Sequence, residues 1–147
     1  MNISEIKSKF PVFKKNQNLI FLDTAASSLK VDQMIEATNE CYTNQYANIH
    51  RGNYELSSKL TMKFEEAREK IAKFLNVSHK NIIFVKSATE GINLVSSSLS
   101  SKHLNDGDEI IISYLEHHAN IIPWHLIDKK IKIVPLNINK DGEIIYN

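Results

Sequence analysis

The spacing of apolar residues along the first half of the chain predicts helices. In residues 31–46 and 57–75, apolar side chains recur every three or four positions, which is typical of amphipathic helices. Ser57 stands at the start of the second helix, where a serine hydroxyl commonly caps free backbone amides. Residues 4–9 predict a further short helix, which Pro11 ends.

The second half of the chain alternates short apolar runs with helical patterns. Residues 81–85, 109–113 and 132–136 are nearly continuous apolar runs, as in strands buried on both faces of a parallel sheet. Helical patterns at 89–100 and 119–128 lie between these runs. This alternation predicts an α/β fold with a mostly parallel sheet and flanking helices. The sequence stops soon after a turn, so we expect residues 1–147 to form the incomplete front part of one domain.

Composition and charge exclude several classes of function. A chain of 147 residues suffices for one domain, and 18 basic against 17 acidic residues leave a net charge of +1. That balance predicts no binding of nucleic acid or of an anionic membrane. The apolar runs are too short to span a bilayer, and the N-terminus resembles no secretory signal. The single cysteine, Cys41, permits no internal disulfide and fits a reducing compartment, so we expect a cytoplasmic protein.

The first candidate site is the passage from strand to helix at residues 85–94. Free amides at the start of a helix, with the Thr89 hydroxyl beside them, can bind an anionic group such as phosphate. The plainer alternative is that Ser87 or Thr89 only caps the helix. The segment matches neither the P-loop nor the dinucleotide glycine pattern.

The second candidate site, residues 114–120, follows the next predicted strand at the edge where α/β sheets bind ligands. His117 and His118 are neighbours, and neighbouring side chains point in different directions, so we predict no metal site. A histidine here suits ring stacking or proton transfer. The alternative is a surface histidine that caps the following helix.

Two further segments could contact a ligand. His50 and Arg51 precede Gly52 in a polar loop, and Arg51 is one of only two arginines in the chain. Residues 23–28 are small and polar, which suits the close approach of a ligand, although a turn and a helix cap would look the same. Cys41 lies among the apolar positions of its helix, so we expect a small buried side chain rather than a nucleophile.

Five segments together resemble a known family. They are residues 21–27 (FLDTAAS), 48–52 (NIHRG), 88–95 (ATEGINLV), 107–113 (GDEIIIS) and 116–124 (EHHANIIPW). In this order they resemble the class V aminotransferase-fold enzymes, and among these the Suf-type (group II) cysteine desulfurases. The resemblance runs over essentially all of the sequence and covers only the first part of a family chain. It implies the N-terminal part of a type I pyridoxal phosphate (PLP)-dependent transferase fold.

The resemblance also implies a chemistry and a set of site residues. Such enzymes use PLP to convert L-cysteine to L-alanine, and the sulfur passes to a Suf-type acceptor protein for iron–sulfur cluster assembly. They act as homodimers. The residues that it implies fall into two groups: Ala88, Thr89 and His117 would bind the cofactor, with His117 stacked on its ring as the catalytic residue, and Ala25, Ala26, His50, Arg51 and Glu90 would line the substrate side and the entrance.

The sequence departs from the family pattern at three places. Ala88 stands where a threonine is usual and offers an N–H group but no hydroxyl, and Tyr54 replaces a usual histidine. In the family, the lysine that bonds to PLP, the acid that pairs with its ring nitrogen and the nucleophilic cysteine lie later in the chain than the part that is matched here. We therefore expect the sequence alone to be inactive. It is either the front part of a desulfurase, or a non-catalytic remnant or interaction piece that binds a desulfurase subunit, or a free-standing phosphate-binding module.

Overall fold

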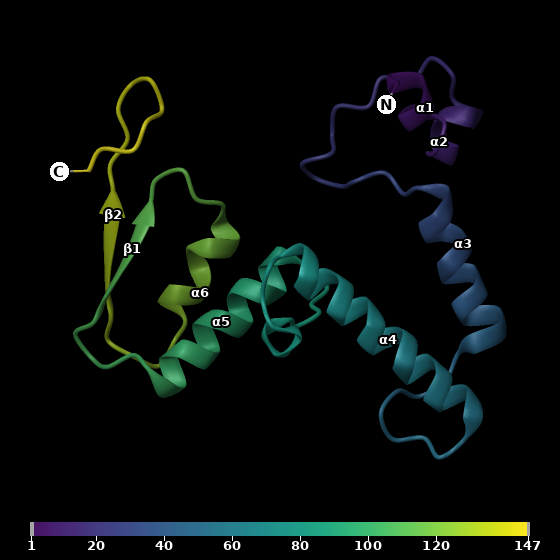
Figure 1. Cartoon of the computed structure of the whole chain (residues 1–147). Coiled ribbons are helices and arrows are strands. Elements are labelled where there is room, and N and C mark those ends of the chain that lie inside the picture. Colours follow the sequence, from purple (N-terminus) through teal and green to yellow (C-terminus); the bar gives the residue numbers. More distant parts are fainter. Residues whose placement is uncertain (1, 147) are drawn as a thin grey trace. The chain divides into compact units, whose positions relative to one another are not determined.

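A computed structural model describes residues 2–146, and the chain divides into two compact units, Met1–Ile82 and Ile83–Asn147. Figure 1 labels the helices and strands of both units. Among the described residues there is one sheet, and it lies in the second unit. The first unit is therefore helical, and the second is α/β.

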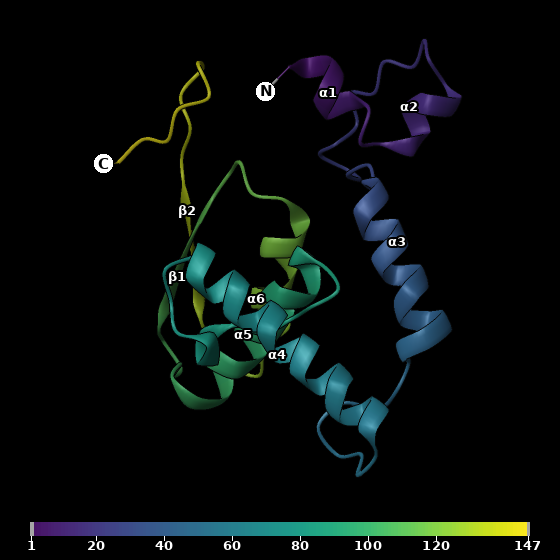
Figure 2. The same cartoon turned by 45° about the vertical axis from the view of Figure 1, so that its right-hand side comes forward.

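The first unit contains the two long helices that the pattern predicts, but Pro11, expected to end the helix predicted for residues 4–9, instead begins a second short helix. Its elements are α1 (Ile3–Lys7), α2 (Pro11–Lys15), α3 (Asp32–Glu40), a π-helical turn (Cys41–Gln45), α4 (Glu55–Phe74) and a short 3-10 turn (His79–Asn81). The helix predicted for residues 31–46 is thus α3 extended by the π-helical turn, and the helix predicted for residues 57–75 is α4. In Figure 2, α4 is seen as one long, unbroken helix.

The start of α4 differs from the prediction. The helix begins at Glu55 with Tyr54 at its N-cap, so Ser57 is not the cap. The Ser57 side chain is instead almost completely buried, at 1% exposure, and its hydroxyl donates a hydrogen bond of 2.6 Å to the backbone carbonyl of Asn48. Ser57 therefore ties the helix to the loop that precedes it.

The second unit contains a parallel strand pair and the helices around it. Its elements are α5 (Ala88–Lys102), β1 (Glu109–Ser113), a 3-10 turn (His118–Asn120), α6 (Ile122–His125) and β2 (Lys132–Leu136). The two strands are parallel, and Ile111 lies opposite Val134. The chain crosses from β1 to β2 through α6, which packs against α5 (Figures 1 and 2). The strands predicted at 109–113 and 132–136 are confirmed.

The helix predicted for residues 119–128 is shorter than expected. A 3-10 turn and the four residues of α6 take its place, and the chain leaves the helix at Leu126. The reason is the short connection to β2: the backbone N–H of Lys130 donates to the Asp106 carboxylate at 2.9 Å, which draws this segment toward the turn before β1. Tertiary contacts therefore override the helical pattern at its end.

The strand predicted at residues 81–85 is wrong. Asn81 ends a 3-10 turn, and Ile82 to Val85 belong to no sheet within residues 2–146. The backbone of Ile82 is nevertheless extended, with φ of −98° and ψ of 122°. A strand needs a neighbouring backbone to accept and donate its ladder hydrogen bonds, and the two strands of this unit pair with each other.

Few apolar side chains are buried in either unit. The buried apolar residues in the described part of the chain are Ala72, Ile82, Ile112, Pro123 and Trp124. Large apolar side chains on the predicted inward faces stay exposed, among them Phe74 at 89%, Ile83 at 68% and Ile111 at 63%. Many large apolar side chains are thus exposed in both units.

Candidate functional site

The turn before α5 is held by two hydrogen bonds. The Ser87 hydroxyl accepts from the backbone N–H of Glu90 at 3.1 Å, and the Glu90 carboxylate accepts from the backbone N–H of Lys86. This differs from the capping box only in that the acid accepts from the residue before the cap and not from the cap itself. Ser87 is therefore the cap, and the alternative function of Thr89 as a cap does not apply.

The first two amides of α5 remain available to a ligand. The backbone N–H groups of Ala88 and Thr89, and the Thr89 hydroxyl, find no acceptor within residues 2–146, and both residues are exposed. The helix behind them has 15 residues, so its N-terminus carries the positive end of a full macrodipole. Two amides and one hydroxyl at such an end are suited to hold a phosphate group.

The loop after β1 holds His117 in a defined orientation. Its Nδ1 atom accepts from the backbone N–H of Ala119 at 3.1 Å, which caps the 3-10 turn and leaves the proton of the neutral ring on Nε2. The His117 ring is exposed and meets the His118 ring edge-on, with 6.0 Å between centroids. Since the 3-10 turn packs against α5, the same unit carries both the amide donors and this ring.

Glu116, Asn120 and Trp124 hold the loop that carries His117. The sequence pattern did not assign them this positioning role. The Asn120 side chain donates to the Glu116 carboxylate at 3.0 Å and accepts from the Trp124 indole N–H at 3.2 Å. Trp124 is buried, so it anchors the chain of contacts in the core of the unit. Glu116, Asn120 and Trp124 follow one another at intervals of four residues, and this regular spacing was a sequence signal that could have revealed their contacts.

The remaining four predicted site residues lie in the first unit. Ala25 and Ala26 are exposed in a turn, where the Ala26 N–H donates to the Asp23 carbonyl at 3.1 Å. His50 and Arg51 are exposed in the loop before α4. The Nε2 atom of His50 lies 3.6 Å from the Glu65 carboxylate.

Cys41 is half-buried at the start of the π-helical turn rather than fully buried as predicted, and its thiol is free. The expected burial of Cys41 is therefore only partly met.

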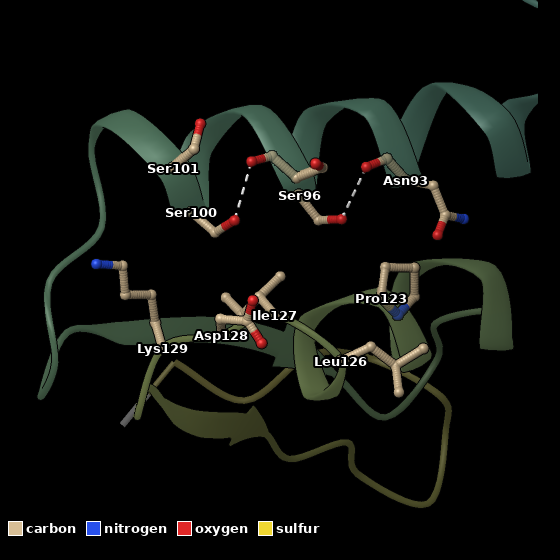
Figure 3. A pocket seen from close by; sticks show the side chains of 10 residues that line it. Asn93, Ser96, Ser100, Ser101, Pro123, Leu126, Ile127, Asp128 and Lys129 are labelled. Atoms are coloured by element: carbon tan, nitrogen blue, oxygen red, sulfur yellow. Dashed lines mark hydrogen bonds between the residues drawn. The ribbon is translucent and has the colours of Figure 1, made fainter.

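A cavity of about 380 Å³ in the second unit contains none of the predicted site residues. It lies between the C-terminal half of α5 and the segment from Pro123 to Lys129 (Figure 3). Three of the serine hydroxyls that border it already donate to backbone carbonyls: Ser96 to Asn93 at 3.0 Å, Ser100 to Ser97 at 2.9 Å and Ser101 to Ser98 at 3.0 Å. The start of α5 is therefore the better candidate for a phosphate.

Neither a metal cluster nor a membrane span is found in the part of the chain that the structure describes. No group of three or more histidine, cysteine, aspartate or glutamate side chains in residues 2–146 is arranged to hold a metal ion. None of the helices there combines the length and the apolar character that crossing a membrane requires.

Comparison with known proteins identifies relatives along almost the whole chain. Residues 20–147 match the family model described as aminotransferase class-V. A probable cysteine desulfurase of Mycolicibacterium paratuberculosis is 42% identical over 92% of this chain and 21% of its own length. A cysteine desulfurase of an Enterobacter species is 39% identical over 93% of this chain and 36% of its own length.

A solved structure shares the fold. The apo structure of a cysteine desulfurase from Thermococcus onnurineus superposes with a TM-score of 0.88 at 29% identity, over 98% of this chain and 36% of that chain. The sequence thus spans about a third or less of the proteins it matches. The predicted fold class, the front part of a PLP-dependent transferase fold with a small parallel sheet, is confirmed.

Proposed function

The chain belongs to the aminotransferase class-V family, and on that premise we propose that it supplies the phosphate-binding turn and the ring-stacking histidine of a PLP-dependent cysteine desulfurase. The observation that carries the proposal is the start of α5, where the amides of Ala88 and Thr89 are unpaired in the same unit as the His117 loop. The class-V and cysteine desulfurase homologues are PLP-dependent.

The residues at the start of α5 fit the phosphate of PLP. Ala88 and Thr89 would hold it through their N–H groups, and Thr89 also through its hydroxyl, while Ser87 and Glu90 keep the turn in place. His117 would lie against the pyridine ring. The hydrogen bond from the Ala119 N–H would keep the imidazole in one orientation for this contact. When bound, PLP supplies an electron-withdrawing ring that allows bonds at the Cα of an amino acid to break.

The finer assignments are also proposals. We assign the chain to the Suf-type group, with L-cysteine as substrate, a homodimeric assembly, a Suf-type sulfur acceptor and a place in the cytoplasm. Ala25, Ala26, His50, Arg51 and Glu90 would line the substrate side and the entrance. Residues 1–147 would be the N-terminal part of the class V domain, and the lysine, acid and cysteine of the reaction would come from the part of the family chain that this sequence does not span.

The test is complementation. The chain is mixed with a second polypeptide that carries the remaining two-thirds of the Enterobacter desulfurase, and alanine and sulfide production from L-cysteine is measured with PLP present. We expect a complex with PLP absorbance and alanine production above that of either piece alone. As a matched pair, Thr89→Val in the chain lowers PLP binding, whereas Thr43→Val, far along the sequence and exposed, does not.

The outcomes separate the two candidate functions. The exposed apolar surface favours an interaction piece as the second candidate, because such a surface suits burial against a partner. A complex that forms on size-exclusion chromatography but produces no alanine contradicts the enzyme and supports the interaction piece. A mixture in which no complex forms contradicts both.

A further inference from the structure

We propose that Ser57, Thr61 and Glu65 of α4 are positioning residues that clamp the loop Asn48–Gly52 and thereby fix Arg51. The inference rests on the proposed function, which puts Arg51 at the substrate entrance. The three residues follow one another at intervals of four, so they lie on one face of α4. All of the contacts that carry the proposal lie within the first unit.

Two backbone groups of the loop are bound by hydroxyls of the helix. The Ser57 hydroxyl donates to the Asn48 carbonyl at 2.6 Å, and the Thr61 hydroxyl accepts from the His50 N–H at 2.9 Å. The Thr61 hydroxyl also donates to the Ser57 carbonyl at 2.8 Å, which orients its lone pair toward the loop. Since Ser57 is 1% exposed, water does not compete for its hydrogen bond.

The side chain of His50 is held from two further directions. Its Nε2 atom lies 3.6 Å from a Glu65 carboxylate oxygen, and its ring meets the Phe64 ring edge-on, with 5.6 Å between centroids. Glu65 is itself oriented by Arg68, whose Nε donates to it at 3.1 Å. The clamp thus holds both the backbone and the side chain of the residue before Arg51.

The backbone of the loop is strained at His50, the residue that contacts Thr61 and Glu65 of the clamp. His50 has a φ of +70°, a left-handed conformation that a residue with a Cβ adopts only at a cost. Such strain persists where the surrounding contacts over-determine the geometry, and it is a feature of functional sites. The observed strain and the three contacts to His50 are therefore consistent with each other.

Gly52 closes the clamp on the other side of Arg51. A Cβ atom at this position would lie 2.2 Å from the Ser57 hydroxyl and 2.5 Å from the Ser57 Cβ, so only glycine allows the loop to approach α4 this closely. Arg51, between these two held residues, is exposed, and its guanidinium makes no hydrogen bond or ion pair within residues 2–146. It is presented to solvent, ready to bind an anionic group such as a carboxylate.

Cleavage by an arginine-specific protease tests the clamp. The chain has only two arginines, so Arg51 reports on the loop and Arg68, inside α4, reports on unfolding of the helix. In the unaltered chain we expect cleavage after Arg51 to require opening of the loop. Thr61→Val removes the bond to His50 and should speed cleavage after Arg51 about fivefold, with cleavage after Arg68 unchanged.

Matched variants separate positioning from a general structural effect. Thr38→Val loses the same kind of intrahelical bond, 2.8 Å to the Met34 carbonyl, without any loop contact, so cleavage after Arg51 should not change. Thr61→Ser keeps the hydroxyl and should restore slow cleavage. Ser57→Ala should speed cleavage after Arg51 as Thr61→Val does. Its control is Ser58→Ala, which removes only an intrahelical bond and should leave cleavage after Arg51 unchanged.

Three results would overturn the clamp: cleavage after Arg51 in the unaltered chain that is as fast as in the denatured chain, no effect of Thr61→Val, or a Thr61→Ser variant as fast as Thr61→Val. The assay contains neither PLP nor L-cysteine. Its failure would therefore leave the proposed desulfurase function intact, and a failed complementation would leave the clamp intact.

Discussion

At the scale of single residues, Thr89 at the start of α5 and His117 in the loop after β1 have different proposed functions: Thr89 would bind the phosphate of PLP, and His117 would stack on its ring. Thr89 offers an amide and a hydroxyl that no protein group accepts within residues 2–146. His117 offers a ring whose Nδ1 atom is already used. The two residues should therefore respond differently to substitution.

Thr89→Val keeps the shape of the side chain and removes one hydroxyl. In the complemented enzyme we expect the affinity for PLP to fall by about 1–2 kcal/mol, which is about tenfold, because one hydrogen bond to a charged phosphate is lost. Titration of PLP absorbance measures the effect. An unchanged affinity would remove Thr89 from the phosphate site.

His117→Ala removes the ring that we propose to stack on PLP, together with the group suited to proton transfer. We expect turnover to fall by more than PLP occupancy, since the phosphate contacts of α5 remain. Parallel measurement of alanine production and bound PLP checks this, with His118→Ala as the neighbouring control. Equal loss of both quantities would mean that His117 acts only by holding the loop.

At the scale of elements, the join between α3 and the π-helical turn depends on one carboxylate. Hydrogen bonds from the side chains of Asn44, at 2.7 Å, and Gln45, at 2.9 Å, lower the pKa of Glu40 from its ordinary value, with a smaller contribution from the charge of Lys63. Because the pKa of Glu40 is lower in the folded state than in the unfolded state, the hydrogen bonds to its carboxylate stabilise the folded state at neutral pH. This stabilisation is lost as the pH falls through the folded-state value.

This join should therefore respond to acid in a predictable way. The side-chain amide signals of Asn44 and Gln45, followed by NMR, should titrate with a midpoint below the ordinary glutamate pKa of about 4.3. Glu40→Gln should abolish that titration while the helix before it persists. A midpoint at or above the ordinary value would contradict the lowered pKa.

At the scale of the whole molecule, the exposed apolar side chains should drive association. Phe74, Ile83 and Ile111 are all more than half exposed, and residues 82–85 pair with no strand within residues 2–146. We expect the purified chain to form concentration-dependent oligomers, as measured by light scattering after size-exclusion chromatography. A monomer that melts cooperatively over a wide concentration range would be contrary to this expectation.

The chain alone should also be inactive as a desulfurase. The family chemistry needs a lysine bonded to PLP, an acid at the ring nitrogen and a thiolate, and the resemblance assigns none of these to residues 1–147. With PLP and L-cysteine, alanine should not exceed the background from free PLP. Clear production that is lost on Cys41→Ser or Lys86→Ala would instead reveal a shorter catalytic architecture.

The pattern along the chain was enough to predict α3, α4, α5, the strand pair, the α/β class and the family, because local periodicity and ordered motifs do not depend on distant contacts. Tertiary contacts alone determine that residues 81–85 form no strand, because a strand exists only with a partner, and that Ser57 is buried, because its acceptor is the Asn48 carbonyl nine residues away. The same holds for the left-handed backbone of His50, whose N–H is bound by the Thr61 hydroxyl eleven residues away. Both depend on which groups the fold brings within hydrogen-bond distance, and spacing along the chain does not encode that.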